Sequence, residues 1–158
     1  MSIDKKSLFS KIKWQLFLLA KFKIPMLGYT GVRLLELNKT TVKVKIKLKR
    51  RTKNHLNSMY FGALAVGADV AAGIHAFYFA NIYSTKVSFA FKGMNCEFFK
   101  RAESDCVFIS EDGKKVDEAI LLSIKTKERI NETTHVSVYN NLNELVATFN
   151  MIVSVKCN

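Results

Sequence analysis

The sequence contains few of the residues that interrupt or cross-link a polypeptide chain. It has one proline (Pro25), seven glycines and three cysteines among 158 residues. So little proline and glycine leaves no room for a long flexible linker, and a chain of this length can bury a substantial core. The scarcity of chain breakers therefore predicts one domain over residues 1–158.

The cysteines follow neither a metal-binding nor a disulfide pattern. Cys96 and Cys106 lie in one region and Cys157 is remote, and an odd set at these spacings fits no zinc knuckle or disulfide framework. Free thiols are typical of a reducing compartment, so we expect a cytoplasmic protein. The sequence also has no His/Cys/Asp cluster and no glycine-rich phosphate loop. We therefore predict no metal and no cofactor.

Acidic residues are scarce relative to basic ones. Lysines and arginines number 25 against 13 acidic residues, which gives a net charge of +12. Such an excess favours an anionic partner, which is a nucleic acid, a membrane surface or a phosphorylated ligand, unless it reflects only a lysine-rich solvated surface. No helix-turn-helix, zinc-finger or RNA-binding sheet motif accompanies the charge, so we expect no nucleic acid.

The N-terminal segment 1–31 has an apolar run that is too short to span a bilayer. The run WQLFLLA covers Trp14–Ala20, basic residues follow it, and no cleavage site of a signal peptide is evident. Residues 5–23 instead predict a basic amphipathic helix, which either packs on its own domain or lies on an anionic membrane at its inner surface. Its apolar stripe consists of Leu8, Ile12, Leu16 and Leu19.

The remaining chain, residues 32–158, shows strand-like and helix-like periodicity. Thr41–Lys49 alternates between aliphatic residues and lysines, which is typical of an antiparallel strand with one wet face. A helix from near Tyr60 to about Asn81 is apolar on all sides, and Asn57 or Ser58 is the expected cap. Further elements are strands at Val32–Leu37, Val87–Phe99, Cys106–Ser110, Thr133–Tyr139 and Leu145–Val155, and an exposed amphipathic helix from Val116 to near Arg129.

The order of these elements predicts an α+β architecture. Nothing but a single sheet is available to bury a helix that is apolar all round, so the antiparallel sheet must curve around it. Small residues between Ala63 and Gly73 allow the sheet to approach closely. This arrangement is the hotdog fold, with residues 32–158 as its core and residues 1–31 as an N-terminal helix and connector.

The segment Asn54–Gly73 resembles the hotdog thioesterases of the phenylacetic-acid-pathway type, and most closely their uncharacterised thioesterase-like relatives. That family has an Asn, then Gly-Thr or a similar pair, then His-Gly-Gly, and an acidic residue seven positions after the second Gly. The matching residues here are Asn54, Asn57-Ser58, Tyr60-Phe61-Gly62 and Asp69. The stretch FFKRAESD, Phe98–Asp105, resembles the family's strand that ends in Pro-Ala, with Arg101 replacing the proline.

The resemblance implies an acyl thioesterase that hydrolyses an acyl-CoA or acyl-carrier-protein thioester. It further implies a homodimer or a dimer of dimers, with sites built between protomers. Asp69 would then face the site of the opposite protomer as general base or nucleophile. The Phe61 N–H would polarise the carbonyl, Gly62 would permit close approach, and the Asn54 amide would hold the carbonyl or the water.

Substrate-binding roles follow from the same resemblance. Basic residues would meet the phosphates of the CoA or carrier arm, and the residues around the helix start would contact the rest of the substrate. These residues are Arg51, Lys53, Lys100 and Arg101 for the phosphates, and His55, Ser58 and Tyr60 for the remainder.

Two alternatives stay open at the level of sequence. Tyr60 and Phe61 replace His and Gly, which would also suit a protein that binds acyl thioesters without hydrolysing them. Asp69 could equally be a buried structural carboxylate. His75 lies about 120° from Asp69 around a helix, so the two form no dyad, and we expect His75 to pack in the core.

Overall fold

The computed structural model describes residues 5–158, so the first four residues of the predicted N-terminal segment lie outside the described residues. In chain order the elements are α1 (Lys5–Leu18), the π-helical turn η1 (Leu19–Lys23), α2 (Pro25–Thr30), β1 (Arg33–Leu37), β2 (Val42–Ile46), α3 (Phe61–Ile82), β3 (Val87–Phe98), β4 (Cys106–Ser110), α4 (Gly113–Thr126), β5 (Ile130–Tyr139) and β6 (Leu145–Cys157).

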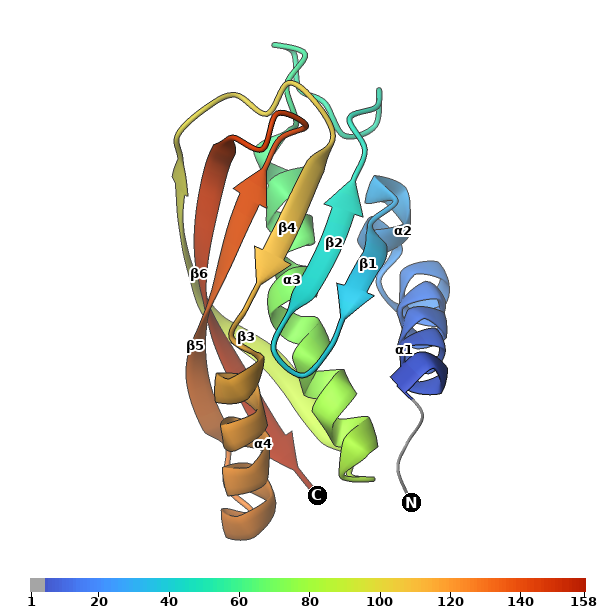
Figure 1. The fold of residues 1–158 in the computed structure, drawn as a ribbon, viewed down its shortest axis with the longest axis vertical. Helices are drawn as coiled ribbons and strands as arrows, with labels where there is room; N and C mark the ends of the chain where they lie inside the picture. Colours follow the sequence, from blue (N-terminus) through green and yellow to red (C-terminus); the bar gives the residue numbers. More distant parts are fainter. Residues whose placement is uncertain (1–4) are drawn as a thin grey trace.

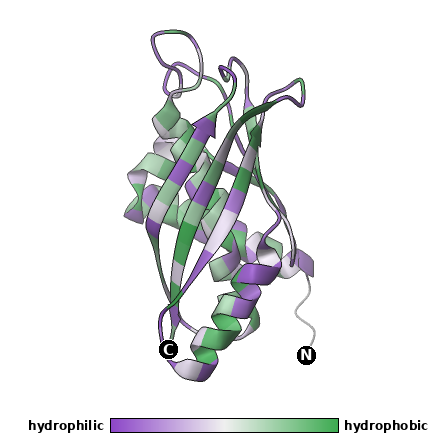
Figure 2. Cartoon of the chain, turned by 90° about the vertical axis from the view of Figure 1, so that its left-hand side faces the viewer, coloured by the Kyte–Doolittle hydropathy of each residue, from purple (hydrophilic) through white to green (hydrophobic). Residues whose placement is uncertain are grey.

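All six strands form one antiparallel sheet in the order β1-β2-β4-β5-β6-β3. The sheet curves around α3, which runs along its inner face (Figure 1). This arrangement confirms the predicted α+β hotdog fold. Hydrophilic and hydrophobic residues alternate along the strands, as expected for a sheet with one face on the core and the other in solvent (Figure 2).

Small residues on α3 let the sheet approach the helix closely. A Cβ atom on Gly67 would overlap the ring of Phe108, which is fully buried on β4. A Cβ atom on Gly73 would lie 2.8 Å from the ring of Phe89 on β3. By length and composition α3 could cross a membrane, but 78% of its most apolar window is buried inside the fold. We therefore interpret α3 as the core helix.

The expectation that α3 is buried all round is wrong for one strip of its surface. Gly62, Ala65, Val66 and Asp69 lie on one side of the helix and are only partly buried. The strip is left open, whereas the sheet and the helices α1, α2 and α4 pack on the other sides of α3. Asp69 thus has partial access to solvent within one protomer.

The structure of the N-terminal segment differs from the predicted helix and connector. The stripe of Leu8, Ile12 and Leu16 packs on the domain and is buried. The α-helix ends at Leu18 and continues as η1, and α2 follows where only a connector was expected. Helix α2 forms because proline suits a first helical position and Gly31, with φ of 67°, adopts the left-handed conformation that ends a helix.

Several predicted boundaries also differ from the structure. Helix α4 begins at Gly113 and ends at Thr126, because Lys127 turns into the left-handed region with φ of 61°. The strand expected over Thr41–Lys49 is shorter, while β5 and β6 extend beyond their predicted ends. The cap of α3 is Tyr60, and neither Asn57 nor Ser58 caps it.

Strand β3 forms an open edge of the sheet. It pairs with β6 on one side and has no strand on the other among residues 5–158. None of its residues is buried, whereas β6 is mostly buried. Met94 and Phe98 on this strand expose about half of their surface. A long edge with exposed apolar residues is a surface on which another strand can pair.

Candidate functional site

The loop that precedes α3 is organised by Asn54. Its Oδ1 atom accepts hydrogen bonds from the backbone N–H groups of Leu56 at 2.9 Å and Ser58 at 3.2 Å, and from the Ser58 hydroxyl at 3.2 Å. Asn57 adopts a left-handed conformation with φ of 60°, which asparagine tolerates better than most residues. The side-chain oxygen of Asn54 therefore holds the loop in place. Of the side-chain amide, only the Nδ2 group remains to contact a ligand.

Helix α3 begins with two unpaired backbone donors. The Tyr60 N–H donates to the Thr52 carbonyl at 2.8 Å, and the Tyr60 carbonyl accepts from Ala63 and Leu64. The N–H groups of Phe61 and Gly62 have no hydrogen-bond partner within the described chain. A helix N-terminus carries a partial positive charge, so these two groups can stabilise an anionic oxygen.

A cavity of about 570 Å³ opens at this helix start. The hydrogen bond from Met59 N–H to the Ala102 carbonyl, 2.7 Å long, holds the chain after β3 against the loop before α3. The lining residues are Asn54, His55, Leu56, Ser58, Met59, Tyr60, Phe61, Leu64, Phe98, Phe99, Lys100, Arg101 and Ala102. Two segments that are distant in the sequence thus form one concave surface.

The cavity contains most of the site residues predicted from the sequence. Seven of them line it, namely Asn54, His55, Ser58, Tyr60, Phe61, Lys100 and Arg101. Gly62, Arg51, Lys53 and Asp69 do not line it. Sequence reasoning did not assign a site role to the apolar lining, which includes Phe98 and Phe99. Their position directly before Lys100 and Arg101 was the available signal.

An aromatic pair lies at the start of α3. The rings of Tyr60 and Phe61 are 4.7 Å apart, and a Cβ atom on Gly62 would overlap the Tyr60 ring. Both side chains are about half exposed. The Tyr60 ring therefore lies directly beside the Gly62 backbone at the cavity mouth.

The basic residues at and near the cavity differ in how far their charges are neutralised. Lys100 Nζ contacts Glu144 Oε1 at 2.6 Å, and this bond holds the pKa of Glu144 below its usual range. Arg101 has no ion-pair partner within residues 5–158 and is exposed. Arg51 stacks over the Tyr29 ring at 5.5 Å. Arg101 is thus the lining cation with an uncompensated charge.

Asp69 lies apart from this cavity within one protomer. It follows Phe61 by eight positions, which is about 12 Å along a helix axis. It makes no hydrogen bond or ion pair with any described residue, and burial raises its pKa from 3.8 to about 6. Asp69 can meet the helix start only if a second chain supplies one of the two groups.

His75 is a core residue. It is fully buried, and Nε2 lies 2.9 Å from the Asn38 carbonyl, so this nitrogen is the protonated one. Nδ1 has no partner within the described chain, and burial lowers the pKa of the ring. His75 contacts neither the cavity nor Asp69. The described residues also contain no group of three or more side chains suited to a metal ion.

A family model described as "Domain of unknown function (DUF4442)" matches residues 13–155 of the chain. A search of curated proteins found no match.

Solved structures share the fold at low sequence identity. A protein of unknown function from Chlorobaculum tepidum is 13% identical, with a TM-score of 0.81 and coverage of 97% of this chain and 96% of its own. A thioesterase family protein from Silicibacter pomeroyi is 16% identical, with a TM-score of 0.69 and coverage of 96% and 99%. A mutant thioesterase from Pseudomonas aeruginosa is 12% identical, with a TM-score of 0.69 and coverage of 92% and 94%.

Proposed function

Since the chain belongs to the family described as "Domain of unknown function (DUF4442)", and its fold is that of thioesterase-like hotdog proteins, we propose that it is an acyl thioesterase. Its substrate is an acyl-CoA or acyl-carrier-protein thioester. The observation that carries the proposal is the start of α3, where the N–H groups of Phe61 and Gly62 are free and Phe61 lines a cavity with an apolar wall and a basic rim.

Each part of this cavity suits one part of an acyl thioester. The N–H groups of Phe61 and Gly62 polarise the thioester carbonyl and stabilise the oxyanion that forms when water attacks. Phe98 and Phe99 offer apolar surface to the acyl chain. Arg101, with its unpaired charge, meets a phosphate of the CoA or carrier arm.

The general base in this proposal is Asp69 of a second protomer. A pKa of about 6 leaves Asp69 ionised at neutral pH and still basic enough to take a proton from water. The open edge of β3 and the partly buried strip of α3 that contains Asp69 offer a surface for that protomer. Pairing of two β3 edges would extend the sheet and cover both strips, so we propose a homodimer with a composite site.

A thiol-release screen over acyl-CoA chain lengths tests this function. We expect turnover of at least one chain length, and its loss in Asp69→Asn. A folded protein that releases no thiol from any acyl-CoA or acyl-carrier-protein substrate would overturn the proposal.

The second candidate function is binding of acyl thioesters without hydrolysis. It is favoured by the Tyr60 ring, which lies beside the Gly62 backbone and adds bulk at the proposed reaction site. Equilibrium binding of a non-hydrolysable acyl-CoA thioether distinguishes the two. Tight binding together with no thiol release would identify a binder.

A further inference from the structure

The N-terminal helices expose an unusual number of large apolar side chains. We define the N-terminal patch as Trp14, Phe17, Phe22, Ile24, Met26 and Tyr29, each of which exposes between 42% and 66% of its surface. Isolated apolar residues on a surface need no explanation, but six large ones exposed between Trp14 and Tyr29 indicate an interaction site.

The patch lies opposite the face of α1 that packs on the domain. At 100° per residue, Trp14 and Phe17 point away from the buried stripe of Leu8, Ile12 and Leu16. Their rings stack at 5.3 Å, and Lys21 lies over both Phe17 and Phe22. The stripe that suggested membrane contact in the sequence is therefore occupied by the core, and a different set of residues faces outward.

The charged residues within the segment that carries the patch are all of one sign. Between Lys5 and Leu35 every charged residue is a lysine or arginine. Lys11 and Lys13 lie on α1 on either side of its exposed aromatic residues, and Lys21 and Lys23 lie on η1. Aromatic residues flanked by lysines are typical of helices that lie in the interface of an anionic bilayer.

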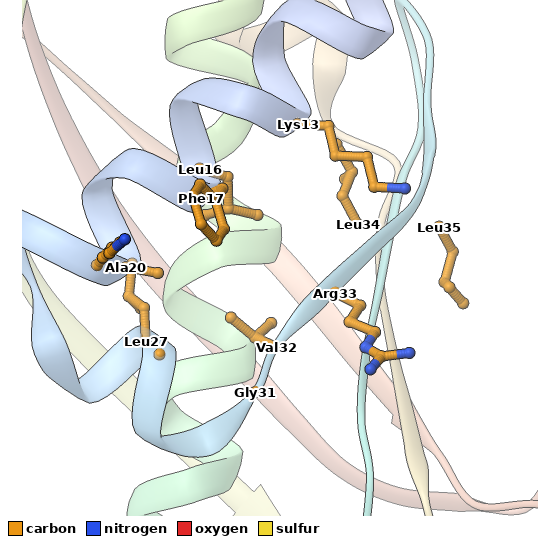
Figure 3. Close-up of a pocket in the computed structure, with 12 residues that line it drawn as sticks. Lys13, Leu16, Phe17, Ala20, Leu27, Gly31, Val32, Arg33, Leu34 and Leu35 are labelled. Carbon is orange, nitrogen blue, oxygen red and sulfur yellow. The ribbon is translucent and has the colours of Figure 1, made fainter.

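A groove beside the patch has the same combination of chemistry. It has a volume of about 760 Å³ and lies between the N-terminal helices and β1. Leu16, Leu27 and Val32 form an apolar wall, and the charged groups of Lys13 and Arg33 lie on one side (Figure 3). Phe17 belongs to both the groove and the patch. An apolar groove with cations at its rim suits the acyl chain and phosphate of an anionic phospholipid.

We propose that the N-terminal patch is a docking surface for an anionic phospholipid bilayer. The lysines bring the protein to the negative surface, and the aromatic side chains enter the interface between headgroups and acyl chains. This inference goes beyond the proposed hydrolase function and does not depend on it.

A second copy of the chain suits the N-terminal patch less well than an anionic bilayer does. Two patches in contact would place lysines against lysines, and the segment from Lys5 to Leu35 offers no acidic residue to pair with them. Like charges at an interface oppose association. An anionic bilayer neutralises the same lysines.

The only tryptophan of the chain lies in the patch and reports on docking directly. Trp14 is 60% exposed, so its emission is that of a solvated indole in the free protein. With vesicles of phosphatidylcholine and phosphatidylglycerol we expect a blue shift and quenching by brominated lipid. Pure phosphatidylcholine vesicles, or about 1 M NaCl, where the Debye length is about 3 Å, should abolish both effects.

Paired variants distinguish binding through the N-terminal patch from nonspecific adsorption to the vesicles. Phe17→Ser with Phe22→Ser removes the aromatic contacts, and Lys21→Glu with Lys23→Glu reverses the charge. Each pair should reduce vesicle partitioning by about tenfold or more, at unchanged melting temperature, because every residue changed is exposed. The matched controls on α4, Leu121→Ser with Leu122→Ser and Lys114→Glu with Lys125→Glu, should bind as the wild type does.

Three results would overturn the proposal. The first is Trp14 emission that does not change at saturating anionic lipid. The second is equal loss of binding in the α4 controls. The third is a dimer in sedimentation velocity that dissociates in Phe17→Ser with Phe22→Ser, since the patch would then be a protein interface.

Discussion

Asp69 is the residue on which the proposed chemistry depends. Asp69→Asn keeps the size of the side chain and removes the base. Because a general base contributes about 10²–10⁴-fold, we expect kcat to fall by about a hundredfold or more. Thiol release measures the loss, and Glu118→Gln, which alters an exposed carboxylate on α4, is the control. Unchanged hydrolysis in folded Asp69→Asn would place the chemistry on another residue.

The same substitution should change the pH dependence of stability. Burial raises the pKa of Asp69 from 3.8 to about 6, so between these values the unfolded chain ionises while the folded chain keeps its proton. The contribution of Asp69 to the free energy of unfolding should therefore fall as pH rises through this window, by at most about 3 kcal/mol. The Asp69→Asn variant has no titratable group at this position, so its stability should lack this contribution.

Urea unfolding at about pH 4 and pH 7.5 checks this expectation. The variant should match the wild type at the lower pH and be more stable at the higher one. If Asp69 were instead part of a structural ion pair, Asp69→Asn would lose about 3–5 kcal/mol at neutral pH.

Arg101 and Lys100 allow the recognition of phosphate to be tested separately from catalysis. Arg101 has no ion-pair partner in the described chain, whereas Lys100 is paired with Glu144. We expect Arg101→Ala to raise KM for acyl-CoA by about tenfold, the scale of one charge-assisted hydrogen bond, and Lys100→Ala to raise it less. With an acyl-pantetheine substrate, which lacks the phosphates, both variants should match the wild type. An equal effect on both substrates would contradict a phosphate contact.

At the scale of the secondary-structure elements, Gly67 lets α3 approach the sheet closely at Phe108. We expect Gly67→Ala to destabilise the protein by about 1–3 kcal/mol, because a Cβ atom there overlaps a fully buried ring. Gly93→Ala is the control, since its Cβ atom meets only the end of the half-exposed Ile152 side chain at 3.0 Å. Chemical denaturation compares the two, and the combination of Gly67→Ala with Phe108→Leu should recover part of the loss.

The elements that the sequence predicted well are those whose periodicity reflects burial. Alternation identified the strand that begins near Thr41, and a long apolar run identified α3, because each pattern is imposed by one buried face or by complete burial. Helix α2 was missed because Pro25 and Gly31 indicate breaks. Only the burial of Leu27 and Thr30 against the rest of the protein shows that a short helix fits between them.

The candidate site could be predicted only in part for a related reason. The motif from Asn54 to Gly62 is local, and the sequence identified it by resemblance. The cavity also needs Phe98–Ala102, and a long-range hydrogen bond from Met59 N–H to the Ala102 carbonyl brings that segment into place. The periodicity of apolar residues in a sequence does not predict a hydrogen bond between segments that are far apart in the chain. The role of the Asn54 carbonyl in holding its own loop was likewise visible only in three dimensions.

At the scale of the whole molecule, the N-terminal patch and the open edge of β3 are two separate surfaces, each with a proposed partner. The N-terminal patch is formed by the helices beside β1, while the open edge is β3 at the other end of the strand order. A dimer formed through β3 therefore leaves both N-terminal patches free. Arg51 stacks on Tyr29 of the patch and lies in the loop that leads to the candidate site. A membrane-bound dimer would thus hold its site loops close to the bilayer surface.

The composite site gives the sharpest test of the assembly. Asn54→Asp keeps the Oδ1 acceptor that holds the loop and loses the Nδ2 donor, while Asp69→Asn loses the base, so each homodimer should be nearly inactive. In a mixed dimer one site carries both changes and the other carries neither, because a two-fold interface contributes the same residues from each chain. After unfolding and refolding of an equal mixture, about half of the dimers are mixed, and activity should recover to about one quarter of wild type. Active-site titration on the refolded mixture checks the fraction of competent sites. If Asn54 and Asp69 instead served one site within a single chain, every site would contain one of the two substitutions. The refolded mixture would then stay inactive.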